Sequence, residues 1–140
     1  DARPIDDAGA GPPPGPPLDP LLAARPGYTL LNLRTAFAKL QSTPAPPQGL
    51  IFAPDRPIAF VLLSDPAARV AEVQRIDLAG FAVRTFELGT PPEADGLLPA
   101  VERAFVTQTH PEGRISFIPL DEADGRVETV SGFALNGRIE

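Results

Sequence analysis

Hydrophobic residues recur at intervals of three and four in residues 28–41, a spacing typical of one face of an amphipathic helix. The recurring positions are Leu30, Leu33, Phe37 and Leu40. Proline lacks the amide donor that a helix needs and disfavours helical backbone in the residue before it. Because three prolines fall within residues 44–47, the pattern predicts a helix that ends before them.

Two further segments show helical spacing. Residues 64–80 open with Ser64-Asp65-Pro66, a sequence typical of a helix start, and reach Gly80, which favours a helix end. Residues 97–109 carry apolar side chains at similar spacing, with Pro99 in the expected first turn. The pattern therefore predicts a helix in each segment.

Short apolar runs predict the strands. Residues 50–53 and 58–63 are separated by Pro54-Asp55-Arg56-Pro57, which has the composition of a turn. The second run has no polar alternation, so we expect a strand in the middle of a sheet that is covered on both faces. Another strand is expected over residues 81–88, and a β-hairpin over residues 115–130, where a glycine-containing loop separates two β-prone runs.

The expected order is helix, strand, strand, helix, strand, helix, strand, strand. This order predicts an α/β (α+β) fold, with a mixed sheet of about five strands and two to three packed helices. The length of 140 residues fits one domain, which we place at residues 27–140 after an extended Pro-rich arm at residues 1–26.

The arm holds eight of the 19 prolines and no aromatic residue. Such a segment favours extended polyproline II backbone, because it has few apolar side chains to bury. We expect it to be dispensable for folding and to serve as a spacer or as a strip that docks on a partner. The docking positions are then Pro12, Pro13, Pro14, Pro16 and Pro17.

The composition and charge of the chain argue against several classes of function. The net charge of −6 argues against a nucleic-acid partner. The absence of cysteine excludes disulfides, thiolate zinc sites and cysteine nucleophiles. His110 is the only histidine, and the acidic loop at residues 120–125 lacks calcium-loop spacing. We therefore expect no metal, no cofactor and no catalytic residue in this chain.

The compartment is inferred from what the sequence lacks. No apolar run approaches the roughly 18 residues that cross a bilayer, so we expect no membrane insertion by the chain as given. The chain has no methionine and starts at Asp1, which indicates a processed or engineered start that an upstream membrane anchor would account for. We expect an extracytoplasmic (periplasmic) or membrane-tethered protein of a bacterium, and a cytoplasmic location stays open.

The leading functional hypothesis is a non-enzymatic protein-interaction domain of a bacterial envelope or other multi-protein assembly. The expected contacts are the arm and an exposed edge strand that includes Val127, Thr129 and Val130.

Two alternatives stay open. One is a small-molecule-binding or hydrolytic domain, with a carboxylate and histidine site at strand ends. Its residues are Asp65, Glu87, Glu93, Asp95 and His110. The other is an acidic regulator that masks a basic partner.

Overall fold

The computed structural model describes residues 25–121 and 125–132, and in these residues the chain is built almost entirely of β-strands. The strands are β1 (Gly27–Leu31), β2 (Ala38–Ser42), β3 (Pro47–Phe52), β4 (Ile58–Asp65), β5 (Val70–Asp77), β6 (Val83–Glu87), β7 (Pro92–Leu98), β8 (Arg103–Gln108), β9 (Arg114–Pro119) and β10 (Glu128–Ser131). A short 3-10 turn, η1 (Pro99–Val101), joins β7 to β8.

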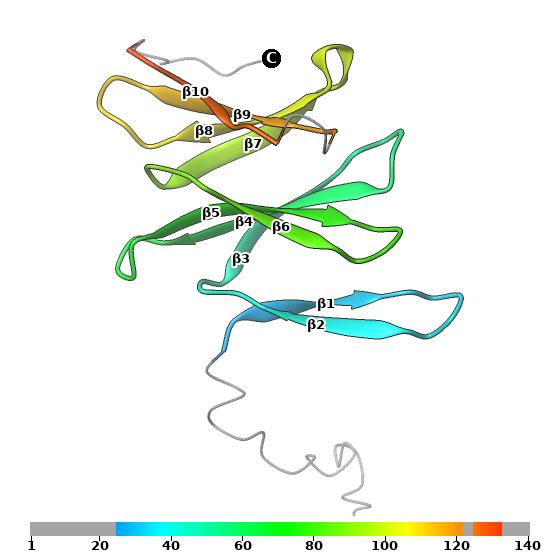
Figure 1. Cartoon of the computed structure of the whole chain (residues 1–140). Coiled ribbons are helices and arrows are strands. Elements are labelled where there is room, and N and C mark those ends of the chain that lie inside the picture. Colours follow the sequence, from blue (N-terminus) through cyan, green and yellow to red (C-terminus); the bar gives the residue numbers. More distant parts are fainter. Residues whose placement is uncertain (1–24, 122–124, 133–140) are drawn as a thin grey trace, which may run out of the picture.

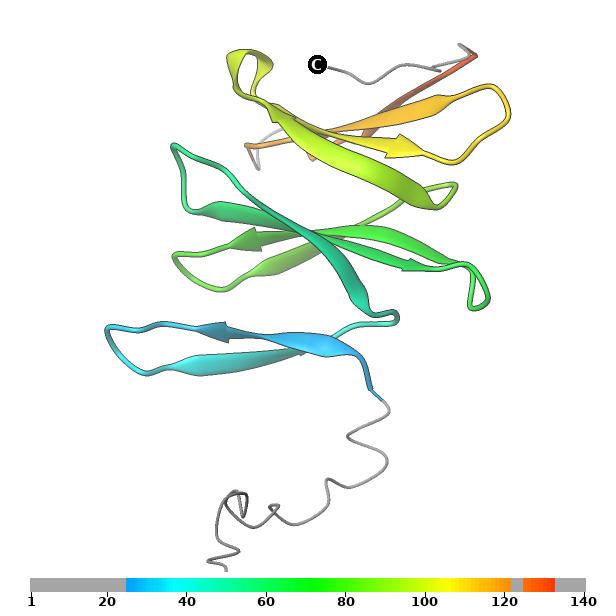
Figure 2. The same ribbon diagram turned by 180° about the vertical axis from the view of Figure 1, so that it is seen from behind.

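The strands form three antiparallel layers. The N-terminal hairpin consists of β1 and β2, the middle sheet has the order β3-β4-β5-β6, and the C-terminal sheet has the order β10-β9-β8-β7. Within each layer every strand pairs with its neighbour in the sequence. The layers are stacked, with the N-terminal hairpin at one end and the C-terminal sheet at the other (Figures 1 and 2).

The prediction of an α/β (α+β) fold with packed helices was therefore wrong. The helix expected over residues 28–41 is the N-terminal hairpin, in which Leu30 is buried against the middle sheet while Leu40 lies on the outer face. Ala36 has a φ of 57° in the turn, a conformation that an α-helix does not contain. The helical spacing arose because Leu30 in β1, Leu33 and Phe37 in the connection, and Leu40 in β2 fall three or four positions apart.

The helix expected over residues 64–80 is a turn followed by β5. Asp65 does cap the turn, since its carboxylate accepts hydrogen bonds from the amides of Ala67 and Ala68. Arg69, however, has a φ of 57°, and the chain then enters β5. The inner residues of β5 are buried on both of its faces, so the alternation that marks a strand is hidden.

The helix expected over residues 97–109 is the end of β7, the turn η1 and β8. Pro99 starts the turn as expected, but Glu102 takes a left-handed φ of 52° at its end, and the chain reverses into β8. The apolar residues that suggested one helical face thus belong to two antiparallel strands and, in the case of Val101, to the turn between them.

Several strand predictions were confirmed. β3, β4 and β6 overlap the expected runs, and the expected hairpin is β9 and β10. β4 is buried along nearly its whole length and lies between β3 and β5, as its unbroken apolar run predicted.

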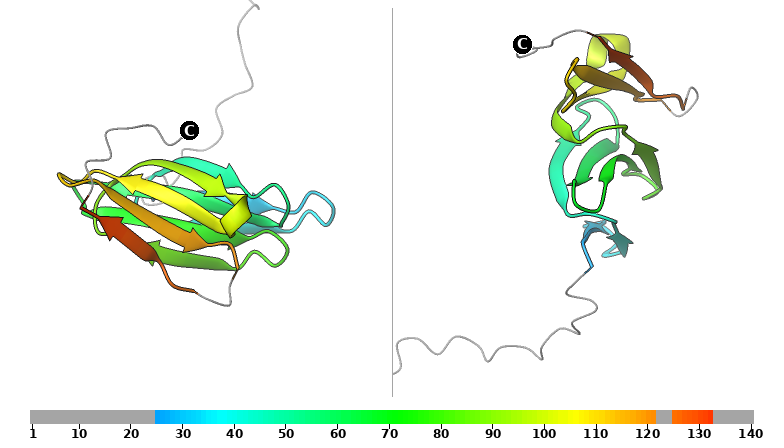
Figure 3. Two further views of the ribbon diagram at one scale, coloured as in Figure 1. Left: turned by 90° about the horizontal axis from the view of Figure 1, so that it is seen from above. Right: turned by 90° about the vertical axis from the view of Figure 1, so that its left-hand side faces the viewer.

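Two hydrophobic clusters lie on opposite faces of the middle sheet, and β4 contributes to both. Phe60 and Leu62 face the C-terminal sheet, where they pack with residues such as Ile118. Val61 and Leu63 face the N-terminal hairpin. The alternation along β4 therefore holds all three layers together. Figure 3 shows the middle sheet between the N-terminal hairpin and the C-terminal sheet.

Two arginines connect the middle sheet to the segment that follows β9. Arg75 and Arg84 lie opposite one another on β5 and β6. Arg75 donates a hydrogen bond of 2.8 Å to the carbonyl oxygen of Leu120, and Arg84 donates one of 3.0 Å to that of Gly125. Arg75 is 7% exposed, whereas Arg84 is exposed and lies over the ring of Phe86.

Candidate functional site: an apolar groove beside the N-terminal hairpin

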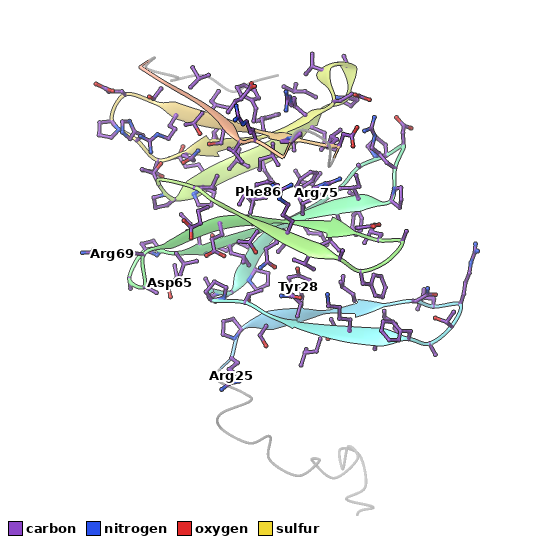
Figure 4. The ribbon with its side chains drawn as sticks, viewed as in Figure 1. Arg25, Tyr28, Asp65, Arg69, Arg75 and Phe86 are labelled. Carbon is purple, nitrogen blue, oxygen red and sulfur yellow. The ribbon has the colours of Figure 1, made fainter. Side chains whose placement is uncertain are left out.

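The N-terminal hairpin is fixed to the middle sheet by two hydrogen bonds and by the stacked rings of Phe37 and Phe81, as well as by Leu30. The hydroxyl of Tyr28 donates a hydrogen bond of 2.7 Å to Oε1 of Gln74 in β5 (Figure 4). The ammonium group of Lys39 donates one of 2.7 Å to the carbonyl oxygen of Phe81. These contacts join the hairpin to β5 and to the turn between β5 and β6.

The hairpin has fewer strands than the sheet it covers, and the inner face of β3 is left open. On β3, Leu50 and Phe52 are 56% and 59% exposed. Their partners across the strand pair, Val61 and Ala59, share the same face and are buried. The hairpin therefore covers the face of β4 and leaves the neighbouring face of β3 in solvent.

The uncovered strip forms a groove of about 420 Å³ between β1 and β3. Its walls and floor include Leu30, Leu50, Phe52, Ala59, Val61 and Ile76. None of the described residues that line it is charged. An open apolar groove of this kind suits hydrophobic side chains of a ligand or partner.

The N-terminal hairpin, which forms one wall of the groove, is basic, although the protein as a whole is acidic. Residues 25–48 contain Arg25, Arg34 and Lys39 and no aspartate or glutamate. The acidic excess of this chain, with its net charge of −6, lies entirely in the other residues. A partner with negative charge beside its apolar residues would therefore match this layer.

Tyr28 is a natural reporter at the groove, because it is the only tyrosine and the chain has no tryptophan. Burial raises its pKa from the ordinary 10.0 to about 12. We expect an ultraviolet absorbance titration of the folded protein to show phenolate formation near pH 12. Between about pH 10 and 12 only the unfolded chain loses this proton, so the stability of the fold should decrease as the pH rises through this window. A midpoint near 10 in the folded protein would contradict the buried position of Tyr28.

The structure places the predicted edge-strand residues at the end of the C-terminal sheet. β10 is the outermost strand of its sheet, and Thr129 and Val130 are exposed on it. Val127 precedes β10 and is partly buried against the core. Thr129 contacts Ser116 at 2.8 Å between hydroxyl oxygens. The predicted arm residues, Pro12, Pro13, Pro14, Pro16 and Pro17, lie outside the described residues, and their role as a docking strip stays a prediction.

The residues of the alternative site each have a different environment. Asp65 caps a turn, and Glu87 lies opposite Glu72 across β5 and β6. Glu93 accepts a hydrogen bond of 3.1 Å from Thr109, and His110 accepts one of 3.2 Å from the amide of Glu112. The turns that follow β4, β6 and β8 lie on the same side of the molecule, at the left in Figure 1, but belong to two different layers.

Asp95 is the remaining residue of that set, and part of its carboxylate is shielded from solvent. It lies opposite Val106 on β7 and β8, and its Oδ2 is buried with no hydrogen-bond partner among the described residues. Desolvation by burial raises its pKa, partly opposed by a backbone hydrogen bond. Burial, and secondarily the charge of Glu87, raise the pKa of Glu72.

The described residues contain no group of three or more histidine or acidic side chains placed to hold a metal ion. In the same part of the chain, no helix is long and apolar enough to span a bilayer.

The groove was missed in the sequence because it depends on how the layers overlap. Leu50 and Phe52 looked like ordinary strand residues. The one signal that could have pointed to this region is the stretch between Asp19 and Asp55, which contains no acidic residue in an otherwise acidic chain.

Comparisons of this chain with protein-family models, with curated proteins and with solved structures gave no match.

Proposed function

We propose that this chain is a non-enzymatic protein-interaction domain of a multi-protein assembly, and that it binds its partner through the apolar groove. The observation that carries the proposal is the exposure of Leu50 and Phe52 beside a hollow with no charged lining residue. Apolar patches with a hollowed shape on soluble domains mark interaction sites more often than isolated exposed side chains do.

The exposed edge of β10 and the Pro-rich arm are secondary contacts in this proposal. The arm is expected from its sequence to be extended, and β10 offers a partner the exposed edge of a sheet. A place in the bacterial envelope, with the arm as a spacer, stays part of the proposal and rests on composition alone.

The groove can be tested with one charge substitution. Leu50→Glu places a carboxylate in the groove, and because this side chain is already more than half exposed, the fold should tolerate it. The matched control is Val101→Glu, since Val101 is 61% exposed in η1 at the opposite end of the stack. The partner recovered from the native host should bind Leu50→Glu about tenfold more weakly, since hot-spot losses exceed about 1.4 kcal/mol.

Binding of the recovered partner should be unchanged by Val101→Glu. Equal loss with both variants, or loss with neither, would contradict the proposal. A different result would favour the site at the strand ends instead. In that case His110→Ala or Glu93→Gln abolishes a hydrolytic or ligand-binding activity, while Leu50→Glu still binds the partner normally.

A further inference from the structure

The pairing register of the N-terminal hairpin leaves a row of backbone groups of β1 facing the groove. Asn32 donates its amide hydrogen to Phe37, and Thr43 donates to Pro26. In an antiparallel ladder, hydrogen-bonded pairs alternate with non-bonded pairs. Tyr28 and Leu30 therefore point their backbone groups toward β2, whereas Gly27, Thr29 and Leu31 point theirs toward the open edge of β1.

This open edge lies along the groove. Thr29 lines the groove although strand alternation turns its side chain away from the middle sheet, so it meets the groove through its backbone edge. A strand paired with β1 would lie about 4.8 Å beyond it, over the uncovered face of β3. Every second side chain of that strand would then point toward Leu50 and Phe52.

Two positively charged side chains lie near the two ends of β1, and so near the two ends of a strand that would pair with it. Arg25 lies just before β1 and Arg34 lies in the turn after it, and both are exposed. Neither forms an ion pair with a described residue. They can therefore attract carboxylates at the two ends of an added strand.

We propose that the groove accepts an extended, acidic segment of a partner protein, which adds to the edge of β1 as a third strand. The segment has apolar residues at alternate positions and carboxylates near its ends. Its backbone pairs with Gly27, Thr29 and Leu31, and its apolar side chains cover Leu50 and Phe52. This inference rests on the proposed function and specifies its binding mode.

The test uses the full chain and a capped peptide, DVTVTVD, as the probe. Binding is followed by the fluorescence of Tyr28, which no other tyrosine or tryptophan of this chain obscures. Two further peptides carry N-methyl groups on alternate residues, one on the odd set and one on the even set. Strand addition requires only one set of amides to face β1, so one methylated peptide should bind about tenfold more weakly than the other. Equal binding of the two would overturn the proposal.

Two proline substitutions test the same pairing from the side of the protein. Thr29→Pro removes an amide on the open edge of β1, and Leu40→Pro removes the corresponding amide on the opposite edge of the hairpin. Thr29→Pro should weaken peptide binding about tenfold, whereas Leu40→Pro should leave it within about twofold. Circular dichroism serves to check that both variants are folded. Equal effects of the two substitutions in folded variants would overturn the proposal.

Charge is tested separately. Arg34→Glu should weaken DVTVTVD and strengthen the capped peptide KVTVTVK, each by about threefold or more. If the two peptides respond alike, the acidic character of the partner is wrong. If Leu50→Glu abolishes partner binding while the backbone tests show no asymmetry, the proposed function stands and strand addition fails. If Leu50→Glu also has no effect, both fail.

Discussion

Replacing Leu63 with alanine is expected to lower the free energy of unfolding by about 3 kcal/mol. Leu63 lies in β4 and has no exposed surface. It faces the N-terminal hairpin, in the same hydrophobic cluster as Leu30 and Phe81. Removing its branched end costs the transfer free energy of the lost methyl groups. It also leaves a cavity between two layers of strands that cannot easily collapse. Urea denaturation followed by circular dichroism measures this change.

Leu40→Ala is the matched control, because Leu40 is 72% exposed on the outer face of the same hairpin. Its effect should stay within about 0.5 kcal/mol. Similar losses for the two variants would mean that the N-terminal hairpin does not pack on the middle sheet through the face that carries Leu30.

Replacing Arg75 with alanine should cost about 2 kcal/mol, the second largest effect that we expect. The side chain is buried, and its guanidinium donates to the carbonyl oxygen of Leu120. Without it, a buried carbonyl group at the end of β9 loses a charged donor, and the contact between the middle sheet and this segment is weakened. Denaturation curves and amide exchange at Ile118 and Leu120 measure the loss.

Arg84→Ala provides the comparison. Arg84 occupies the facing position on β6 and donates to the carbonyl oxygen of Gly125, but it is exposed. Its replacement should cost less than about 1 kcal/mol. An Arg84→Ala effect as large as that of Arg75→Ala would show that burial does not determine the strength of these two contacts.

The sequence indicated strands well where a run was short, apolar and bounded by turn residues. The run that became β4 was identified together with its burial on both faces, because a short apolar run without polar alternation is typical of a strand covered on both sides. The hairpin of β9 and β10 was also predicted, since its loop contains a glycine between two β-prone runs.

Helical spacing was misleading where a turn joined two strands. In β1 and β2, Leu30 and Leu40 have opposite orientations, and only the three-dimensional pairing reveals this. In β5, Val73 faces the C-terminal sheet while Ile76 faces the N-terminal hairpin. Three-residue spacing in a strand puts side chains on opposite faces, whereas in a helix it puts them on one face. In the sequence alone, the apolar residues of a strand that is buried on both faces therefore have the same spacing as those on one face of a helix.

The groove could not be derived from sequence patterns, because it is a difference in coverage between two layers. Leu50 and Phe52 have the same residue types as the buried positions of β4. Their exposure follows from the number of strands in the N-terminal hairpin and from the side of the middle sheet on which it packs. No local propensity encodes either quantity.

The pairing of each strand with its neighbour in the sequence also affects how this protein is made. Each strand can pair soon after its sequence neighbour has been synthesised, whereas the contacts between the layers form only later. The N-terminal hairpin emerges from the ribosome before the other two layers, yet an isolated two-stranded hairpin is only marginally stable in water. Tyr28 finds its hydrogen-bond partner only once Gln74 has been synthesised. We therefore expect the N-terminal hairpin to lack its native support until β5 is complete, so co-translational folding passes through an interval in which mispairing of β1 with other segments competes with the native layers.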